Sequence, residues 1–420
     1  MESRGRLKMA LNHVQPDRIP VDFGSNGVTG MHVRIVEQLR EYYGLQYRPV
    51  KAVEPYQMLG EIEEDLLDAL GVDVTGLWGK NNMFGIPQEE WKPFKTFWGQ
   101  EILVPGNFNT MIDDNGDLLI YPQGDRSVSA SAKMPKSGYF FDAIIRQQPV
   151  VEEEPDPANN LEEFSQLTDK ELMYWKEQAR KAARSGRGVI ANFGGTALGD
   201  IALVPAMNLK HPKGIRDITE WYISLLLRPD YIHRVFDRQT DIALENLKKI
   251  YGAVGENIDA VFICGTDFGT QDSTFCSPET FRELYAPYYR KVNDWVHNNT
   301  GWKTFKHCCG AVESFMKDFI DAGFDIINPV QISAAGMLPG HLKKEYGDHL
   351  VFWGGGVDTQ KTLPFGTPGE VRDQVLRVCE IFSKNGGYVF NTVHNIQANV
   401  PVKNVIAMLE AIKEFNAAIQ

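Results

Sequence analysis

A six-residue segment in the second half of the chain, FKHCCG at 305–310, carries side chains that can bind a metal ion. If the segment ends a strand, successive side chains point to opposite faces, so His307 and Cys309 share one face and Cys308 points away. An imidazole nitrogen and a thiolate sulfur are ligands that suit Zn²⁺. His394, beyond the last apolar run, is the best candidate for a third ligand. Three protein ligands and an open fourth position are typical of catalytic zinc.

The same residues have a purely structural interpretation. Cysteine is often buried as a small apolar side chain, and a single histidine is more often a hydrogen-bonded core residue than a ligand. The segment contains neither a CxxC nor an HExxH pattern. Gly310 is expected to begin a helix, whose amides would favour a thiolate at Cys309. Spacing alone therefore leaves metal binding and packing both open.

Further polar or aromatic side chains follow apolar runs and are candidates for a site. We expect catalytic roles for Asp267 and Asp358, and substrate-binding roles for Asn192, Asn328, Gln331 and Trp78. Glycines at 194–195 and 354–356 leave the same edge open to a bulky ligand. The alternatives are loop ordering for Asp267 and a turn cap for Asp358. Asp373 lies opposite the apolar stripe of a helical stretch, so we interpret it as a solvated residue.

The elements that must position these residues alternate between strands and helices. Eight strand-like runs lie at 19–23, 72–77, 188–193, 259–264, 303–308, 325–330, 350–355 and 388–392. Helical periodicity spans 30–44 and 61–71, and helical stretches also separate the later runs. Eight such units predict a (β/α)₈ TIM barrel with its chemistry at the C-terminal ends of the strands. An open doubly wound sheet is the alternative, but 23–30 lacks the GxGxxG spacing.

The stretch 80–160 breaks this alternation. Tryptophans, glycines and the turn pair Asn115-Gly116 dominate it, and 118–122 is typical of one arm of a hairpin. We expect one barrel domain over 1–420, with 80–160 as an inserted β-rich subdomain of short antiparallel strands covering the barrel mouth. A separate small domain is the alternative. The aromatic residues in and just before the stretch 80–160 could hold an apolar, planar substrate or form a satellite core: Trp78, Phe84, Trp91, Trp98, Phe108 and Tyr121.

Composition excludes several classes of partner. The chain has 420 residues and a net charge of −12, which argues against nucleic acid or an anionic membrane surface. No stretch approaches the length of a membrane span, and the polar, basic N-terminus predicts no signal peptide. Five cysteines, two of them adjacent, are typical of free thiols in a reducing compartment. We therefore expect a cytoplasmic protein.

Several stretches together resemble the uroporphyrinogen decarboxylase superfamily, which includes corrinoid-dependent methyltransferases. They are DRIPVDF, SPETFRELYAPYYRKVNDWVH, FKHCCG, FIDAGFDIINPVQ, GGGVDTQKTLPFGTPGEV and GYVFNTVHNIQANVPVKNV. The resemblance implies a (β/α)₈ barrel. The zinc methyltransferase branch uses a His-x-Cys pair, matched by His307 and Cys309, and a late cysteine, whose position His394 takes here. The Met-Arg-Gln-Ala-Gly-Arg segment of the true decarboxylases is absent after the first strand-like run.

The resemblance implies a cobamide-dependent methyltransferase. The expected reaction moves a methyl group from a small methylated substrate, best a methoxylated aromatic (O-demethylation), to the Co(I) of a separate corrinoid protein, with Zn²⁺ as Lewis acid. The chain lacks a DxHxxG corrinoid signature, so the cobamide would arrive on that partner. Other donors, the reverse transfer and a homodimer stay open. The alternatives are a metal-free decarboxylase and a non-catalytic corrinoid-binding barrel.

Overall fold

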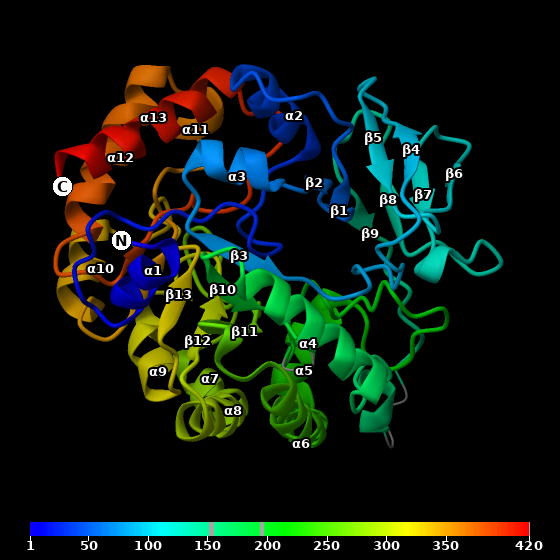
Figure 1. Cartoon of the computed structure of the whole chain (residues 1–420). Coiled ribbons are helices and arrows are strands. Elements are labelled where there is room, and N and C mark those ends of the chain that lie inside the picture. Colours follow the sequence, from blue (N-terminus) through cyan, green and yellow to red (C-terminus); the bar gives the residue numbers. More distant parts are fainter. Residues whose placement is uncertain (151–154, 194–196, 420) are drawn as a thin grey trace.

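A curled parallel sheet of seven strands forms the centre of the computed structural model, which describes residues 1–150, 155–193 and 197–419 (Figure 1). The strand order is β15-β14-β13-β12-β11-β10-β3. The bounds are β3 Val74–Leu77, β10 Gly188–Ala191, β11 Ala260–Cys264, β12 Lys303–His307, β13 Ile326–Asn328, β14 Val351–Trp353 and β15 Tyr388–Val389. All neighbouring strands of the sheet are parallel, so their C-terminal ends lie at the same edge.

Helices surround this sheet (Figure 1). Their bounds are α1 Ser3–Leu11, α2 Val33–Tyr42, α3 Glu64–Leu70, α4 Asp169–Ala183, α5 Ile218–Leu227, α6 Pro229–Val254, α7 Pro278–Leu284, α8 Ala286–Asn299, α9 Met316–Asp321, α10 Pro339–Tyr346, α11 Thr362–Phe365, α12 Pro368–Phe382 and α13 Val402–Ala418. α12 shows how the sequence sets such a helix. Thr367 and Glu370 form a capping box, and Pro368 occupies the first turn. Among the described residues, no helix combines the length and apolar composition needed to cross a bilayer.

Apolar side chains pack on both faces of the sheet. The inner cluster takes residues from all seven strands, together with Leu7, Ala10 and Leu11 of α1; the strand residues are Val74, Ile190, Ala260, Phe305, Ile326, Val351, Trp353 and Val389. The larger cluster joins strand residues of the sheet to the helices and extends into the antiparallel strands between β3 and α4. Since the backbone amide of Arg4 bonds to Gly186, just before β10, α1 lies at the N-terminal ends of the strands.

The first strand-like run, 19–23, forms a single parallel bridge, Val21 with Phe390, instead of a full strand. The Asp22 amide donates to the Phe390 carbonyl at 2.9 Å, and the Asp73 amide donates to the Val21 carbonyl at 2.8 Å. The run therefore lies between the two edge strands, β15 and β3. It is shorter than expected because Pro20 has no amide hydrogen and the Ile19 amide bonds to the Asn416 side chain.

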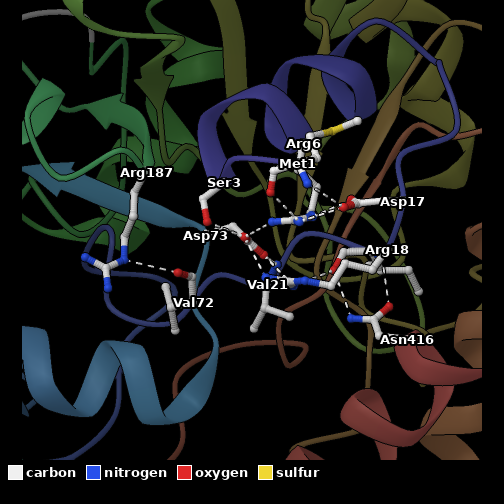
Figure 2. A network of polar contacts seen from close by, with 11 residues as sticks. Met1, Ser3, Arg6, Asp17, Arg18, Val21, Val72, Asp73, Arg187 and Asn416 are labelled. Atoms are coloured by element: carbon white, nitrogen blue, oxygen red, sulfur yellow. Dashed lines mark hydrogen bonds and ion pairs between the residues drawn. The ribbon is translucent and has the colours of Figure 1, made fainter. Parts of the chain in front are cut away.

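A buried carboxylate holds this run to the start of β3. Asp73 is 0% exposed and accepts bonds from Arg6 Nη1, Arg18 Nη1 and Ser3 Oγ, each at 2.7 Å, and from the Val21 amide at 3.0 Å (Figure 2). Two segments, α1 and residues 18–21, thus meet at one side chain beside β3, which holds the N-terminal part of the chain to the sheet.

Antiparallel strands occupy the stretch between β3 and α4. β4 Lys92–Lys95 pairs with β5 Glu101–Val104, and a four-stranded sheet follows, with β6 Thr110–Ile112, β7 Leu118–Ile120, β8 Ala132–Met134 and β9 Asp142–Ala143. A small pair, β1 Ala52–Glu54 and β2 Leu59–Gly60, precedes them. Short 3₁₀ turns lie at Pro122–Gly124, Pro157–Asn160, Gly255–Asn257 and Glu313–Phe315. Figure 1 shows β4–β9 on the side of the molecule opposite α1.

Candidate metal centre

His307, the last residue of β12, is held in one orientation by its neighbour on β13. The strand register places it opposite Asn328, and its Nδ1 lies 2.6 Å from Asn328 Oδ1. Asn328 Nδ2 donates to the Trp353 carbonyl at 2.8 Å, which fixes the amide with its oxygen toward the ring. His307 Nδ1 therefore donates, and the lone pair of Nε2 faces Cys309 Sγ at 3.4 Å.

The three residues expected as metal ligands come together. The ligating atoms of His307, Cys309 and His394 all lie within 4.8 Å of one another, the one such group among the residues that the structure describes. Donors around a tetrahedral Zn²⁺ are about 3.3–3.6 Å apart, given the usual bond lengths. The nitrogen–sulfur pair of His307 and Cys309 already has that separation. Two imidazoles and a thiol therefore fit zinc in chemistry, and the His307–Cys309 pair also fits it in spacing.

Burial sets the protonation of these ligands. It lowers the pKa of His307 and of His394 to about 4, so both rings are neutral near pH 7 and able to coordinate. Burial and the nearby Asp267 carboxylate raise the pKa of the Cys309 thiol well above its usual range. A cation would have to displace that proton. The expectation of a helix start at Gly310 is wrong, because the next helical turn begins at Glu313.

His394 is placed by the N-terminal part of the chain. Its Nδ1 accepts the Asn395 amide at 2.8 Å. The Asn395 side chain donates to Gln57 and to the Gly27 carbonyl, both at 2.8 Å, and accepts the Gly30 amide at 2.6 Å. While Nδ1 accepts, a neutral His394 carries its proton on Nε2. A cation can bind this ring only after Nδ1 loses the Asn395 bond.

Asp267 lies against the thiol segment. Its Oδ1 accepts the Cys309 amide at 2.6 Å, and burial raises its pKa. The Asp267 carbonyl accepts the Tyr222 hydroxyl at 3.0 Å. The Tyr222 ring stacks on Phe275 with centroids 4.6 Å apart. The carboxyl therefore orders the loop beside Cys309, and a catalytic role for it stays a prediction.

Sequence reasoning missed two buried charges beside this site. Asp200 accepts the Gly265 amide at 3.0 Å, and burial raises its pKa to about 6. Lys306 is 0% exposed and donates to the carbonyls of Thr266 at 2.6 Å and His307 at 2.8 Å. The sequence does indicate Lys306, because a lysine within an apolar strand is rarely buried without partners. Asp200 follows no apolar strand, so its role needed the structure.

Three further polar candidates, Gln331, Asn328 and Asp358, make contacts that order the structure around them. Gln331 accepts the Gly310 amide at 2.8 Å and so orders the segment after Cys309. Asn328 is fully buried with its amide bonded to His307 and Trp353, which places it against the imidazole instead of against a substrate. Asp358 Oδ1 accepts the Gln360 amide at 2.9 Å. That contact fits the turn cap, the alternative to catalysis.

Two candidates lie after β3 and β10. Asn192 is exposed, and its amide donates to the Leu77 carbonyl at 3.4 Å. Trp78 is partly buried, and its carbonyl accepts the Tyr174 hydroxyl at 2.9 Å. Gly194 and Gly195, expected to line the same edge, lie outside the described residues.

Most of the aromatic residues after β3 are packed inside the protein, and Phe84 and Phe108 belong to the same apolar cluster as the strands and helices of the parallel sheet. Phe84, Phe108 and Tyr121 are at most 5% exposed, which fits packing, the alternative to contact with a substrate. A cavity of about 220 Å³ lies among the antiparallel strands and is lined by Phe94, Trp98 and other residues, none of which belongs to the metal group. The aromatic content of this stretch is thus largely explained by packing between short sheets.

Comparison with known proteins gives a family and a fold. The family model described as uroporphyrinogen decarboxylase (URO-D) matches residues 140–415. No curated protein matches the chain. A solved structure, a methyltransferase from Methanosarcina mazei, is similar at 13% sequence identity with a TM-score of 0.54, over 99% of each chain. At that identity the structural likeness concerns the fold.

Proposed function

The chain belongs to the uroporphyrinogen decarboxylase family, and on that premise we propose that it is a zinc- and cobamide-dependent methyltransferase. It would move a methyl group from a small methylated substrate to the Co(I) of a separate corrinoid protein. The observation that carries the proposal is the convergence of His307, Cys309 and His394 within 4.8 Å. The similarity in fold to a methyltransferase supports it.

In the proposed reaction the methyl carbon leaves a donor heteroatom and bonds to cobalt. The electron pair of Co(I) on the partner would form the carbon–cobalt bond, and the pair of the broken bond would stay on the heteroatom, which would then take up one proton. Zinc, when bound, would act as a Lewis acid on that heteroatom. His307 and His394 would hold the cation as neutral ligands and Cys309 as a thiolate. Asp267, a carboxyl of raised pKa beside Cys309, is our candidate to supply the proton.

We propose a methoxylated aromatic as the donor. The stacked pair of Tyr222 and Phe275 adjoins Asp267, and the Phe275 side chain is 43% exposed. The pair is linked through Asp267 to the Cys309 amide, and Phe275 offers an exposed, flat, apolar ring, whereas Phe84, Phe108 and Tyr121 are buried. Trp78, partly buried at the end of β3, and Asn192 are further candidates for substrate contact.

The wider architecture supports the same proposal. We propose that the run 19–23 completes an eight-stranded (β/α)₈ barrel, because it bonds to both edge strands. The antiparallel stretch 80–160 would then be an insertion that covers the barrel mouth, opposite α1. The corrinoid protein would approach that mouth. The five free thiols agree with a cytoplasmic protein, and a homodimer is the assembly to test.

Metal analysis and turnover test this proposal together. Protein purified without chelator should hold about one zinc per chain, which His307→Ala and Cys309→Ser should lose. Cys276→Ser is the matched control, since Cys276 is a partly buried free thiol outside the metal group. With Co(I) corrinoid and a panel of methoxyarenes and methylamines, the wild type should produce a methyl–cobalt spectrum. Protein without zinc and without methyl transfer would overturn the proposal and favour a metal-free decarboxylase or a corrinoid-binding barrel.

A further inference from the structure

We infer that Asn328 is a positioning residue that fixes the proton of His307 on Nδ1 and so keeps Nε2 free for a cation. The inference rests on the metal site of the proposed function. The β12–β13 register places the two residues side by side, and the Nδ1–Oδ1 distance is 2.6 Å. Both side chains are buried, at 4% and 0% exposure, so water does not compete readily for either atom.

The amide of Asn328 is itself held in one orientation. Its Nδ2 donates to the Trp353 carbonyl at 2.8 Å. Reversing the amide would bring Oδ1 against that carbonyl and Nδ2 against the Nδ1 proton, which replaces two hydrogen bonds by two repulsive contacts. Trp353 is in turn fixed, because it is fully buried and its Nε1 donates to Asp22 Oδ2 at 2.9 Å. The preferred tautomer of His307 is therefore set by neighbours on two adjacent strands and by the run 19–23.

Loss of this bond would remove the preference. A His307 ring without Asn328 can carry its proton on Nε2, which points at Cys309 Sγ only 3.4 Å away. That tautomer has no lone pair for a cation at the shared position, and the ring would also be free to rotate. Partners that orient a ligand histidine typically contribute about 10- to 100-fold to metal affinity. We expect that range here.

Two variants separate positioning from packing. Asn328→Ala should weaken zinc binding about 10- to 100-fold, measured by competition with a chromophoric chelator. Asn328→Asp should restore it, because a carboxylate accepts the Nδ1 proton and a protonated carboxyl can also donate to Trp353. Both variants should lower the melting temperature. Asn404→Ala is the matched control, since Asn404 is also fully buried and donates through Nδ2 to two carbonyls at 2.8 Å, away from the metal group. It should lose stability and keep its zinc affinity.

A spectroscopic measurement needs no variant. In ¹⁵N-histidine-labelled wild-type protein without metal, His307 should show a protonated Nδ1 and an unprotonated Nε2. In the Co²⁺ form, the thiolate-to-cobalt band should be present for wild type and Asn328→Asp and reduced for Asn328→Ala.

The outcomes distinguish this inference from the proposed function. If wild-type protein binds no zinc, the proposed function fails first. If it binds zinc and Asn328→Ala binds within about threefold of it, or if Asn328→Asp is as weak as Asn328→Ala, the positioning role is overturned while the metal site stands. A proton found on His307 Nε2 in the metal-free wild type would also overturn it.

Discussion

Replacing Asp73 by asparagine tests how the N-terminus is held to the sheet. Asp73 is completely buried, and its two oxygens accept five bonds, from Arg6, from two nitrogens of Arg18, from Ser3 and from the Val21 amide (Figure 2). Asparagine keeps the shape of the side chain. It removes the negative charge and turns an NH₂ group toward donors that need an acceptor.

The expected cost follows from the burial of the partners. Arg6 is also nearly buried, with 6% of its side chain exposed, and Arg18 has 21% exposed. Removing one partner of a buried ion pair typically costs about 3–5 kcal/mol, because the other charge stays buried. Arg6 also pairs with Asp17 at 2.7 Å, which compensates part of its loss. We therefore expect Asp73→Asn to lower the free energy of unfolding by about 3 kcal/mol.

Denaturant unfolding followed by circular dichroism measures this change, and zinc content reports on the distant metal group. Asp373→Asn is the control, because the Asp373 side chain is 73% exposed and its Arg372 contact is 3.5 Å. A surface change of that kind should stay within about 0.5 kcal/mol. A loss below about 1 kcal/mol for Asp73→Asn would refute the reasoning, since the carboxylate would then not hold the run 19–23 in place.

Three further predictions concern pH, packing and metal affinity. Burial lowers the pKa of His32 to about 4, so the unfolded chain takes up a proton between pH 7 and pH 5 that the folded ring does not. Lowering the pH from 7 to 5 should therefore reduce the free energy of unfolding by about 2 kcal/mol more in wild type than in His32→Asn, as measured by denaturant unfolding at both pH values. In Gly76→Ala the new Cβ would lie 1.6 Å from the Ser25 carbonyl oxygen, so soluble yield and melting temperature should both fall sharply. Chelator competition should show a smaller loss of zinc affinity for His394→Ala than for His307→Ala, because His394 must first give up its bond to the next amide; equal losses would contradict that order.

Much of the fold could be predicted from local pattern. Each of the seven later apolar runs contains a strand of the parallel sheet, although the strands are shorter than the runs. The run 19–23 was predicted as a strand and forms only one bridge. Its local hydrophobicity is that of a strand, but Pro20 and the bonds of Asp73 and Asn416 decide how much of it pairs. Periodicity reports which face is buried and says nothing of these distant partners.

For the site, the sequence by itself determined the types of the candidate ligands and the face that His307 and Cys309 share, because strand alternation is a local property. It also offered His394 as the third member. Only the tertiary structure decided that Asn328 faces the imidazole, since the register between β12 and β13 pairs the two residues. The same holds for Asp200 and Lys306, whose partners lie on other segments. The amino-acid sequence specifies the side-chain chemistry, whereas the protonation and orientation of a candidate ligand depend on atoms that folding brings within hydrogen-bonding distance.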